Sequence, residues 1–190
     1  TYTGRSFYPP APRGEDLNLV DIAHALSNQC RFAGHVSSFY SVAQHSFLVS
    51  VYLKEKGESP LTQLTGLMHD AAEAYMVDLP SPVKWLMPAY SKAETALWEV
   101  IRERLQLEDI GESVKKADLA LLAGEARDLM GNPQDWEVLR GLVPPSWIIT
   151  PTDPLTARDG FLILYRDPIA QLGRPPEIWH VNVRPYLADF

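Results

Sequence analysis

Cysteine is almost absent from this sequence: Cys30 is the single one in 190 residues, so no disulfide can form within the chain. A lone thiol is typical of proteins from a reducing compartment. Long apolar runs are also missing, because no stretch approaches the roughly 18 apolar residues that a membrane span needs. Residues 1–16 hold no apolar core of a signal peptide. These absences predict a cytoplasmic protein with no membrane partner.

Basic charge is scarce as well. Seventeen Lys and Arg residues stand against 24 Asp and Glu residues, which gives a formal net charge of −7. Binding to a nucleic-acid polymer needs a basic face, so this class of partner is not expected. Neither G-x-x-x-x-G-K nor G-x-G-x-x-G occurs, which excludes the common glycine-rich nucleotide loops. A small anion in a local basic or metal-lined pocket is still compatible with this composition.

Apolar residues recur at helical spacing along most of the chain, with almost no alternation of period two. A helix is expected from about Asp16 to Cys30, and another over 40–56 after a cap at Ser37 or Ser38. Ser59-Pro60 opens a predicted helix that runs through Met76. Further helices are expected over 91–105 from Ser91, over 113–130 with Ser113 as its cap, and over 155–165.

The pattern therefore predicts an all-α protein with a bundle of five to six helices. A chain of this length usually forms a single domain, here residues 1–190. Its core is expected over about 16–130. Nine of the 16 prolines lie at or after Pro133, so 131–190 is expected to be a proline-rich C-terminal extension, with a short strand over 178–183 as one option.

Polar side chains interrupt the apolar faces of three predicted helices. His45 falls three residues after Val42 on the apolar stripe of its helix, and His69 and Asp70 follow an apolar run directly. Asp118 shares its helix face with apolar neighbours three and four residues away. A core histidine is the ordinary alternative for His45 alone. A carboxylate on an inner face, however, must be paired or bind a metal, because burying an isolated charge is costly.

Two imidazoles and two carboxylates from three helices form a mixed nitrogen and oxygen ligand set. Such a set suits one divalent transition metal, Mn²⁺, Co²⁺, Fe²⁺ or Zn²⁺, better than Ca²⁺. Four protein ligands would leave an octahedral ion two positions, for a water molecule and a substrate oxygen. The residues therefore predict a metal site of the kind used in hydrolysis.

Three segments carry a resemblance to a known family: SVAQHS, LMHDAAEAYMVDLPSPVK and VKKADLALLAGEARD. Over about 20–130 the chain resembles the HD-domain metal-dependent phosphohydrolases. The middle segment is similar to the bacterial 5′-deoxynucleotidase branch, whose motif runs HD-x-x-E-x-x-x-x-D-L-P-x-P-V-K. The resemblance implies an HD-domain helical bundle. It also implies that the metal ligands are His45, His69, Asp70 and Asp118.

The same resemblance implies roles for other residues. Glu73 and Asp78 match the two acidic residues that this branch uses around its nucleophilic water. Arg31 falls near the phosphate-binding arginine, with a spacing to His45 that differs by one residue. Phe32 follows it where the family typically has Trp. No histidine lies between Asp70 and Asp118, where dinuclear members carry more, so one metal ion is implied.

The residues themselves add some independent support. Glu73 lies four residues after His69 and three after Asp70, so all three can border one pocket. Lys84 follows a proline-stiffened loop and is a candidate to steer phosphate, with a solvated lysine as the alternative. Glu125 is expected to form hydrogen bonds rather than to bind the metal.

The function expected from the residues and the resemblance is hydrolysis of deoxynucleoside 5′-monophosphates to nucleoside and phosphate, with a small-molecule nucleotide as partner. One alternative is a dNTP triphosphohydrolase or pyrophosphohydrolase, which the few basic residues near the motifs disfavour. Another is a non-catalytic nucleotide-binding HD module. A homodimer is left open as the assembly.

Overall fold

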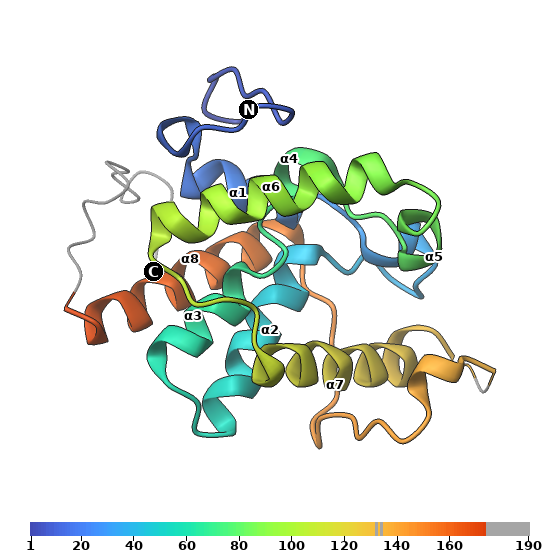
Figure 1. Cartoon of the computed structure of the whole chain (residues 1–190). Helices are drawn as coiled ribbons and strands as arrows, with labels where there is room; N and C mark the ends of the chain where they lie inside the picture. The colour runs from blue at the N-terminus through green and yellow to red at the C-terminus, as the bar shows by residue number, and fades with distance from the viewer. Residues whose placement is uncertain (132, 134, 174–190) are drawn as a thin grey trace.

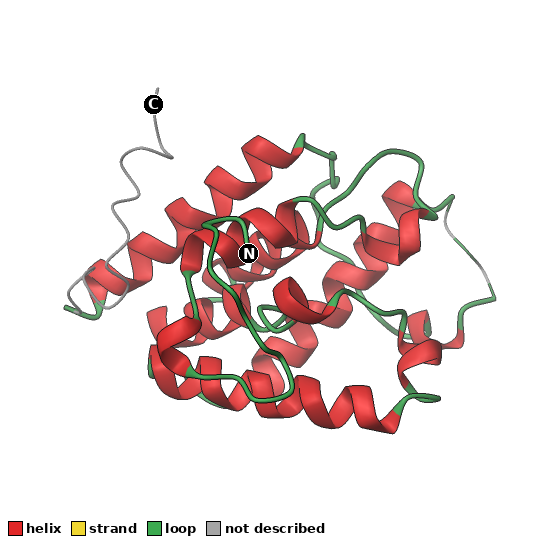
Figure 2. Cartoon of the chain, turned by 90° about the horizontal axis from the view of Figure 1, so that it is seen from above, coloured by secondary structure: helices red, strands yellow, loops and turns green. Residues whose placement is uncertain are grey.

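The computed structural model describes residues 1–131, 133 and 135–173, and in this part of the chain the regular structure is helical throughout (Figure 1). It contains eight α-helices, three 3₁₀ helices and one isolated bridge, between Cys30 and Ser41. Figure 2, viewed from above, shows helices and loops with no strand in the described residues. The predicted all-α class is confirmed. There are more helices than the five to six predicted because two of them are single four-residue turns.

The helices follow one another with short connections. In chain order they are η1 (Gly14–Asp16), α1 (Leu19–Ser27), η2 (Arg31–Gly34), α2 (Val42–Glu55), α3 (Pro60–Met68), α4 (Glu73–Met76), α5 (Ser81–Lys84), α6 (Pro88–Leu105), α7 (Glu112–Leu129), η3 (Glu137–Leu139) and α8 (Pro154–Gln171).

Side-chain caps fix where several helices begin. The Ser59 hydroxyl accepts a hydrogen bond from the Thr62 N–H, and Pro60 follows Ser59 at the first helical position. The predicted start of α3 is confirmed. The cap predicted for α2 at Ser37 or Ser38 is wrong. Ser41 takes that role, because its hydroxyl accepts from the Gln44 N–H at 3.1 Å.

Other predicted boundaries shift by a few residues. The first long helix begins at Leu19 rather than near Asp16 and ends before Cys30. Proline at the first helical position lets α6 start at Pro88, three residues before the predicted Ser91. Gly111 occupies the N-cap position of α7, so Ser113 is not its cap.

The helix predicted to run unbroken through Met76 is in fact two helices. The first ends at Met68, and α4 begins only at Glu73. In between, hydrogen bonds join residues three apart, from the Ala71 N–H to the Met68 carbonyl and from the Glu73 N–H to the Asp70 carbonyl. This tighter winding is typical of 3₁₀ geometry. It places the His69-Asp70 pair in a turn, where α3 gives way to α4.

Helix α2 lies at the centre of the molecule and contacts α1, α3, α7 and α8. Two apolar clusters flank it. One joins residues of α1, α2, α3, α6 and α8, and the other joins α2 and α7 with Tyr40 and Ile149. Gly66 allows α3 to approach closely, because a Cβ at this position would come within 2.2 Å of a Leu53 side-chain carbon. The polar residues of α2 and α3 are thereby held between two cores.

The expected C-terminal extension contributes a helix to the main core. Buried residues of α8, among them Phe161 and Leu162, belong to the larger apolar cluster. The strand considered over 178–183 lies outside the described residues. Among the helices that are described, none has the length and apolar character of a membrane span.

Candidate metal centre

His45 is the innermost residue of the candidate site. It lies in the first turn of α2, and its side chain is fully buried. Its Nδ1 lies 2.6 Å from Oε1 of Glu125, a fully buried carboxylate of α7. This contact leaves Nε2 pointing toward two more carboxylates, 3.1 Å from Asp118 Oδ1 and 3.7 Å from Asp70 Oδ2. Nε2 has no hydrogen-bond partner within the described part of the chain.

His69 presents its ring in the same way from the end of α3. Its Nδ1 is 2.7 Å from the Gly66 carbonyl oxygen, so Nδ1 carries the proton and donates it. Its Nε2 lies 3.3 Å from Asp70 Oδ1 and 3.9 Å from Asp118 Oδ1. This atom, too, is buried without a hydrogen-bond partner among residues 1–131, 133 and 135–173. The two imidazole rings are 5.3 Å apart between centroids.

These side chains could hold a metal ion. Ligand atoms of His45, His69 and Asp70 all lie within 4.8 Å of one another. Two buried imidazole nitrogens without hydrogen bonds fit a cation, because a buried polar atom otherwise carries a desolvation cost. Asp118 borders the cluster from α7 with a side chain that is 42% exposed. The structure thus brings together all four residues that the sequence predicted as ligands.

Glu125 connects the cluster to a buried network, as the expectation of hydrogen bonding suggested. Its Oε1 also accepts from the Tyr40 hydroxyl at 2.8 Å, and its Oε2 accepts from Arg31 at 3.2 Å. Burial would raise the pKa of Glu125, but the charges of Arg31 and His45 lower it to about 2. The carboxylate therefore stays ionised and orients the His45 ring.

The electrostatics of the cluster favour a cation. Burial and the charge of Arg31 lower the pKa of His45, but the carboxylates of Glu125 and Asp118 outweigh both and raise it to about 10. Burial would raise the pKa of Asp118, yet its contact with His45 holds it well below the usual range. A proton therefore resides on His45 in the metal-free protein, at the position where a metal ion would carry positive charge.

No family model matches the chain. It is 44% identical over 144 residues to YfdR of Escherichia coli K12, a match that covers 75% of this chain and 78% of that protein. The chain belongs to the YfdR family. It is also 30% identical over 130 residues to RCAP_rcc00048 of Rhodobacter capsulatus, covering 63% of this chain and 66% of the relative. Both relatives are described as uncharacterized, so the function of this YfdR-family chain has to be argued from its site.

A cavity of about 310 Å³ opens onto the cluster. Its inner end is formed by the candidate ligands His69, Asp70 and Asp118. Other lining residues come from α4, α5, α6 and the loop before α7. The complete set of residues that line it is His69, Asp70, Ala72, Glu73, Lys84, Glu94, Thr95, Trp98, Ile110 and Asp118.

Glu73 lines this cavity from the first turn of α4 and is 5% exposed. Its Oε1 accepts from the Lys84 ammonium at 2.9 Å, whereas Oε2 has no hydrogen-bond partner in the described residues. Burial, and then the charge of Asp70, raise the pKa of Glu73 well above its ordinary value, against the opposing effect of Lys84. Glu73 is therefore placed to take up a proton.

Asp78 is positioned by a strained backbone. Val77 has φ +82°, a left-handed conformation that a β-branched residue rarely adopts. The strain is supported on both sides: the Asp78 N–H donates to Gln29 Oε1 at 3.0 Å, and the Tyr90 hydroxyl donates to the Val77 carbonyl. Burial raises the pKa of Asp78, while the nearby charge of Arg31 lowers it. Asp78 thus interacts electrostatically with Arg31, although it does not line the cavity.

The predicted substrate-binding residues lie in three different environments. Lys84 lines the cavity, but its ammonium lies between Glu73 and Glu94, at 2.9 and 2.8 Å. Arg31 is buried behind the ligands, with its guanidinium 3.2 Å from Glu125 and 3.6 Å from Asp70. Phe32 is not among the residues that line the cavity.

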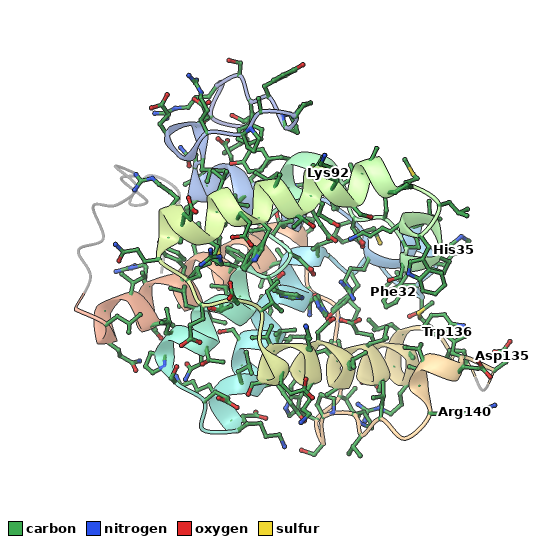
Figure 3. The ribbon with its side chains drawn as sticks, viewed as in Figure 1. Phe32, His35, Lys92, Asp135, Trp136 and Arg140 are labelled. Atoms are coloured by element: carbon green, nitrogen blue, oxygen red, sulfur yellow. The ribbon has the colours of Figure 1, made fainter. Side chains whose placement is uncertain are left out.

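Phe32 and its neighbours form an outer corner of the molecule instead. Figure 3 shows Phe32 beside Trp136 near the C-terminal end of α7, and the two ring centroids are 6.2 Å apart. Phe32 and Ala33 both have positive φ, so the chain turns sharply after Arg31. The turn keeps the two side chains in contact, because the guanidinium carbon of Arg31 lies 5.2 Å from the centroid of the Phe32 ring, so Phe32 borders Arg31 without lining the cavity.

Sequence reasoning missed the supporting residues Tyr40, Gln29 and Tyr90, and the cavity residue Trp98. Tyr40 could have been found from its position just before the N-cap serine of α2, where an apolar side chain is compatible with the pattern. In the structure it is completely buried. No sequence signal distinguishes the hydroxyl of Tyr90 from that of an exposed tyrosine. Their roles depend on contacts between segments far apart in the chain.

Proposed function

We propose that this chain is an HD-domain phosphohydrolase that uses one divalent metal ion and releases phosphate from deoxynucleoside 5′-monophosphates. The observation that carries the proposal is the pair of buried Nε2 atoms, on His45 and His69, that face Asp70 and Asp118 without hydrogen-bond partners in the described chain. Both atoms lie within ion-pair distance of these carboxylates without forming a hydrogen bond to them. A metal ion would use both atoms, because each imidazole ligand offers a nitrogen lone pair once its ring is neutral.

The charge around the cavity supports a metal-assisted reaction. Five carboxyl groups lie in it or pair with its ligands: Asp70, Glu73, Glu94, Asp118 and Glu125. In the part of the chain that is described, the cationic groups among them are Arg31, Lys84 and, in the metal-free protein, the protonated His45. Such a cavity repels a phosphate dianion unless a divalent cation is present. A metal ion held there would supply Lewis-acid polarisation of a phosphoryl oxygen and would acidify a water molecule.

The protein's own groups would perform the remaining work. Glu73 accepts a proton from the attacking water, and burial, which raises its pKa well above the ordinary value, favours this proton uptake. Lys84 holds the other oxygen of this carboxylate in place. Arg31 offers positive charge at the inner end, next to Asp70, where charge develops on the phosphoryl group. The carboxylate of Asp78 adds to the negative charge that acts on Arg31.

The size of the cavity favours a monophosphate over a triphosphate. Its 310 Å³ is at the lower end of the roughly 300–1,000 Å³ that ligand pockets span. A nucleoside triphosphate would bring two further phosphoryl groups into a wall that already carries Glu73 and Glu94. The dNTP alternative is therefore the second choice.

The proposal is tested by product analysis. The metal-free chain is loaded with Mn²⁺, Co²⁺ or Zn²⁺ and incubated separately with a dNMP panel and a dNTP panel, and products are separated by anion-exchange chromatography. We expect phosphate from dNMPs. Tripolyphosphate or pyrophosphate from dNTPs would favour the second choice, and nucleotide binding without any product would favour a non-catalytic module.

Glu73→Gln provides the matched inactive variant. It keeps the size of the side chain and removes its capacity to take up a proton. We expect unchanged metal content and a turnover lower by about 10²–10⁴-fold. Turnover close to that of the unmodified chain would remove Glu73 from the mechanism and leave the metal site standing.

A further inference from the structure

One part of the cavity lining differs in chemistry from the metal ligands. It consists of Thr95 and Trp98 on α6 and Ile110 in the loop before α7. Trp98 lies three residues after Thr95 and four after Glu94, so the three share one face of the helix. The cavity therefore has a charged inner end and an apolar aromatic side. A ligand that fills both must itself have an anionic end and a flat apolar end.

The apolar side is held in place from both cores. Trp98 is partly buried and packs against the larger apolar cluster, next to Leu97 and Ile101, which are fully buried. Ile110 packs against the second cluster, the one that includes α7. An indole anchored in this way can serve as a stacking surface at little cost in side-chain entropy, because its rotamer is fixed before a ligand arrives.

We propose that Trp98, with Ile110 beside it, is the surface that binds the aromatic base of the substrate, and that Phe32 is not. This inference rests on the proposed function, because it names the leaving group of that reaction. Phe32 does not line the cavity and packs beside Trp136 at the outer corner. Among the described residues that line the cavity, Trp98 is the one with an indole ring. The same cavity is lined by His69, Asp70 and Glu73.

The proposal also limits the substrate class. Phosphate esters whose leaving alcohol carries a flat aromatic ring, as a nucleoside does, gain a stacking contact on Trp98. Esters of small polyols or of deoxyribose alone do not. Base stacking on an aromatic side chain is sequence-tolerant, since every base has a π face. Trp98 is thus expected to select nucleotides as a class without choosing strongly between bases.

The experiment measures binding of a ligand that cannot be hydrolysed. Deoxyadenosine and deoxyribose, which carry no phosphoester bond, are titrated by calorimetry into the metal-loaded chain and its variants. We expect deoxyadenosine to bind more tightly than deoxyribose. Trp98→Ala is expected to weaken deoxyadenosine binding by about 5- to 150-fold, with deoxyribose unaffected. Trp98→Phe keeps a stacking ring and is expected to retain most of the affinity.

Two comparisons make the result specific. Trp85→Ala removes an indole that is 79% exposed and outside the cavity, and it is expected to leave the affinity unchanged. Phe32→Ala is expected to have a smaller effect than Trp98→Ala. Metal content and the circular dichroism spectrum of Trp98→Ala verify that the variant is folded. Should it unfold, Trp98→Leu, which keeps an apolar side chain without a ring, carries the test.

The outcomes separate this inference from the proposed function. Equal affinity of Trp98→Ala and the unmodified chain, a larger loss in Phe32→Ala, or no preference for deoxyadenosine over deoxyribose would each overturn the inference, even if phosphate is released from dNMPs. Absence of phosphate release would overturn the proposed function, while selective loss of nucleoside binding in Trp98→Ala would still support the base site.

Discussion

The inner and outer walls of the site are built on different physical principles. The inner wall is the set of candidate metal ligands with their supporting residue Glu125, and the outer wall is formed by Lys84, Thr95, Trp98 and Ile110. On the inner wall, His45, His69 and Glu125 are buried, and each of the two imidazoles has its Nδ1 bound by a specific partner. On the outer wall, Trp98 is only partly buried and Lys84 is held by two carboxylates at the edge of solvent. The segment that follows α5 does not line the cavity and exposes 79% of Trp85 and 83% of Leu86.

This difference indicates a division of roles. Buried charges are costly and tolerate little displacement, so the inner wall can hold ligand atoms in one geometry. Partly exposed ion pairs and apolar contacts are weaker and adapt more easily. The inner wall therefore suits the chemistry common to all substrates, and the outer wall suits recognition of the part that is released.

The largest expected effect lies on the inner wall. Asp70→Asn preserves the shape of the side chain and removes a charged ligand between His45 and His69. Because loss of a supporting partner alone lowers metal affinity by about 10–100-fold, loss of a ligand is expected to exceed about 100-fold. Metal content after dialysis, measured by elemental analysis, checks this. Asp109→Asn, at a carboxylate that is 86% exposed, is the control, and equal metal content in both variants would exclude Asp70 from the site.

A smaller effect on the same wall is expected from Glu125→Gln. The variant keeps the volume but removes the charge that orients His45 and compensates Arg31. We expect metal affinity to fall by about 10–100-fold. Tyr40→Phe removes one hydrogen bond to the same carboxylate and is expected to have a weaker effect in the same direction. A lower melting temperature with unchanged metal affinity would make Glu125 a purely structural residue.

Metal binding is also expected to depend on pH in a definite direction. The pKa of His45 is raised to about 10 in the metal-free protein, so the ring is protonated at neutral pH. A metal ion needs the neutral ring, and binding must therefore release this proton. Affinity is expected to rise by about tenfold per pH unit up to that pKa. Calorimetry at pH 7 to 8, in buffers of different ionisation enthalpy, counts the protons released. A count of zero would contradict the assignment of His45.

The inner wall was largely predictable from the sequence, because its residues violate the apolar pattern. His45 and Asp118 stand where helical spacing calls for an apolar side chain, and such a violation requires a physical reason. The ring orientations were not predictable. They depend on Glu125 and on the Gly66 carbonyl, whose positions follow from the packing of α2 against α7 and from the end of α3.

The outer wall was much less accessible to sequence reasoning. On α6, Leu97 and Ile101 lie four residues apart on one apolar stripe of the helix, and both are buried. Trp98 follows Leu97 directly and lies beside that stripe, so only the placement of α6 against the end of α3 decides that it faces a cavity. Phe32 stays a prediction as a substrate-binding residue, and its position could not be foreseen from the sequence. Two consecutive positive φ values turn the chain after Arg31, and neither Phe nor Ala signals that conformation.

The smallest effect on the free energy of unfolding is expected in the exposed segment after α5. Leu86→Ala changes a side chain that is 83% exposed, so the free energy of unfolding should stay within about 0.5 kcal/mol of the unmodified chain. Leu67→Ala, at a fully buried position in α3, is expected to cost about 2–5 kcal/mol because it leaves a cavity behind the metal ligands. Urea unfolding of the metal-free proteins at two concentrations measures both. A concentration-dependent loss of stability in Leu86→Ala would mean that a second copy of the chain covers this surface in solution. The interface of the homodimer left open by the sequence would then include the segment after α5.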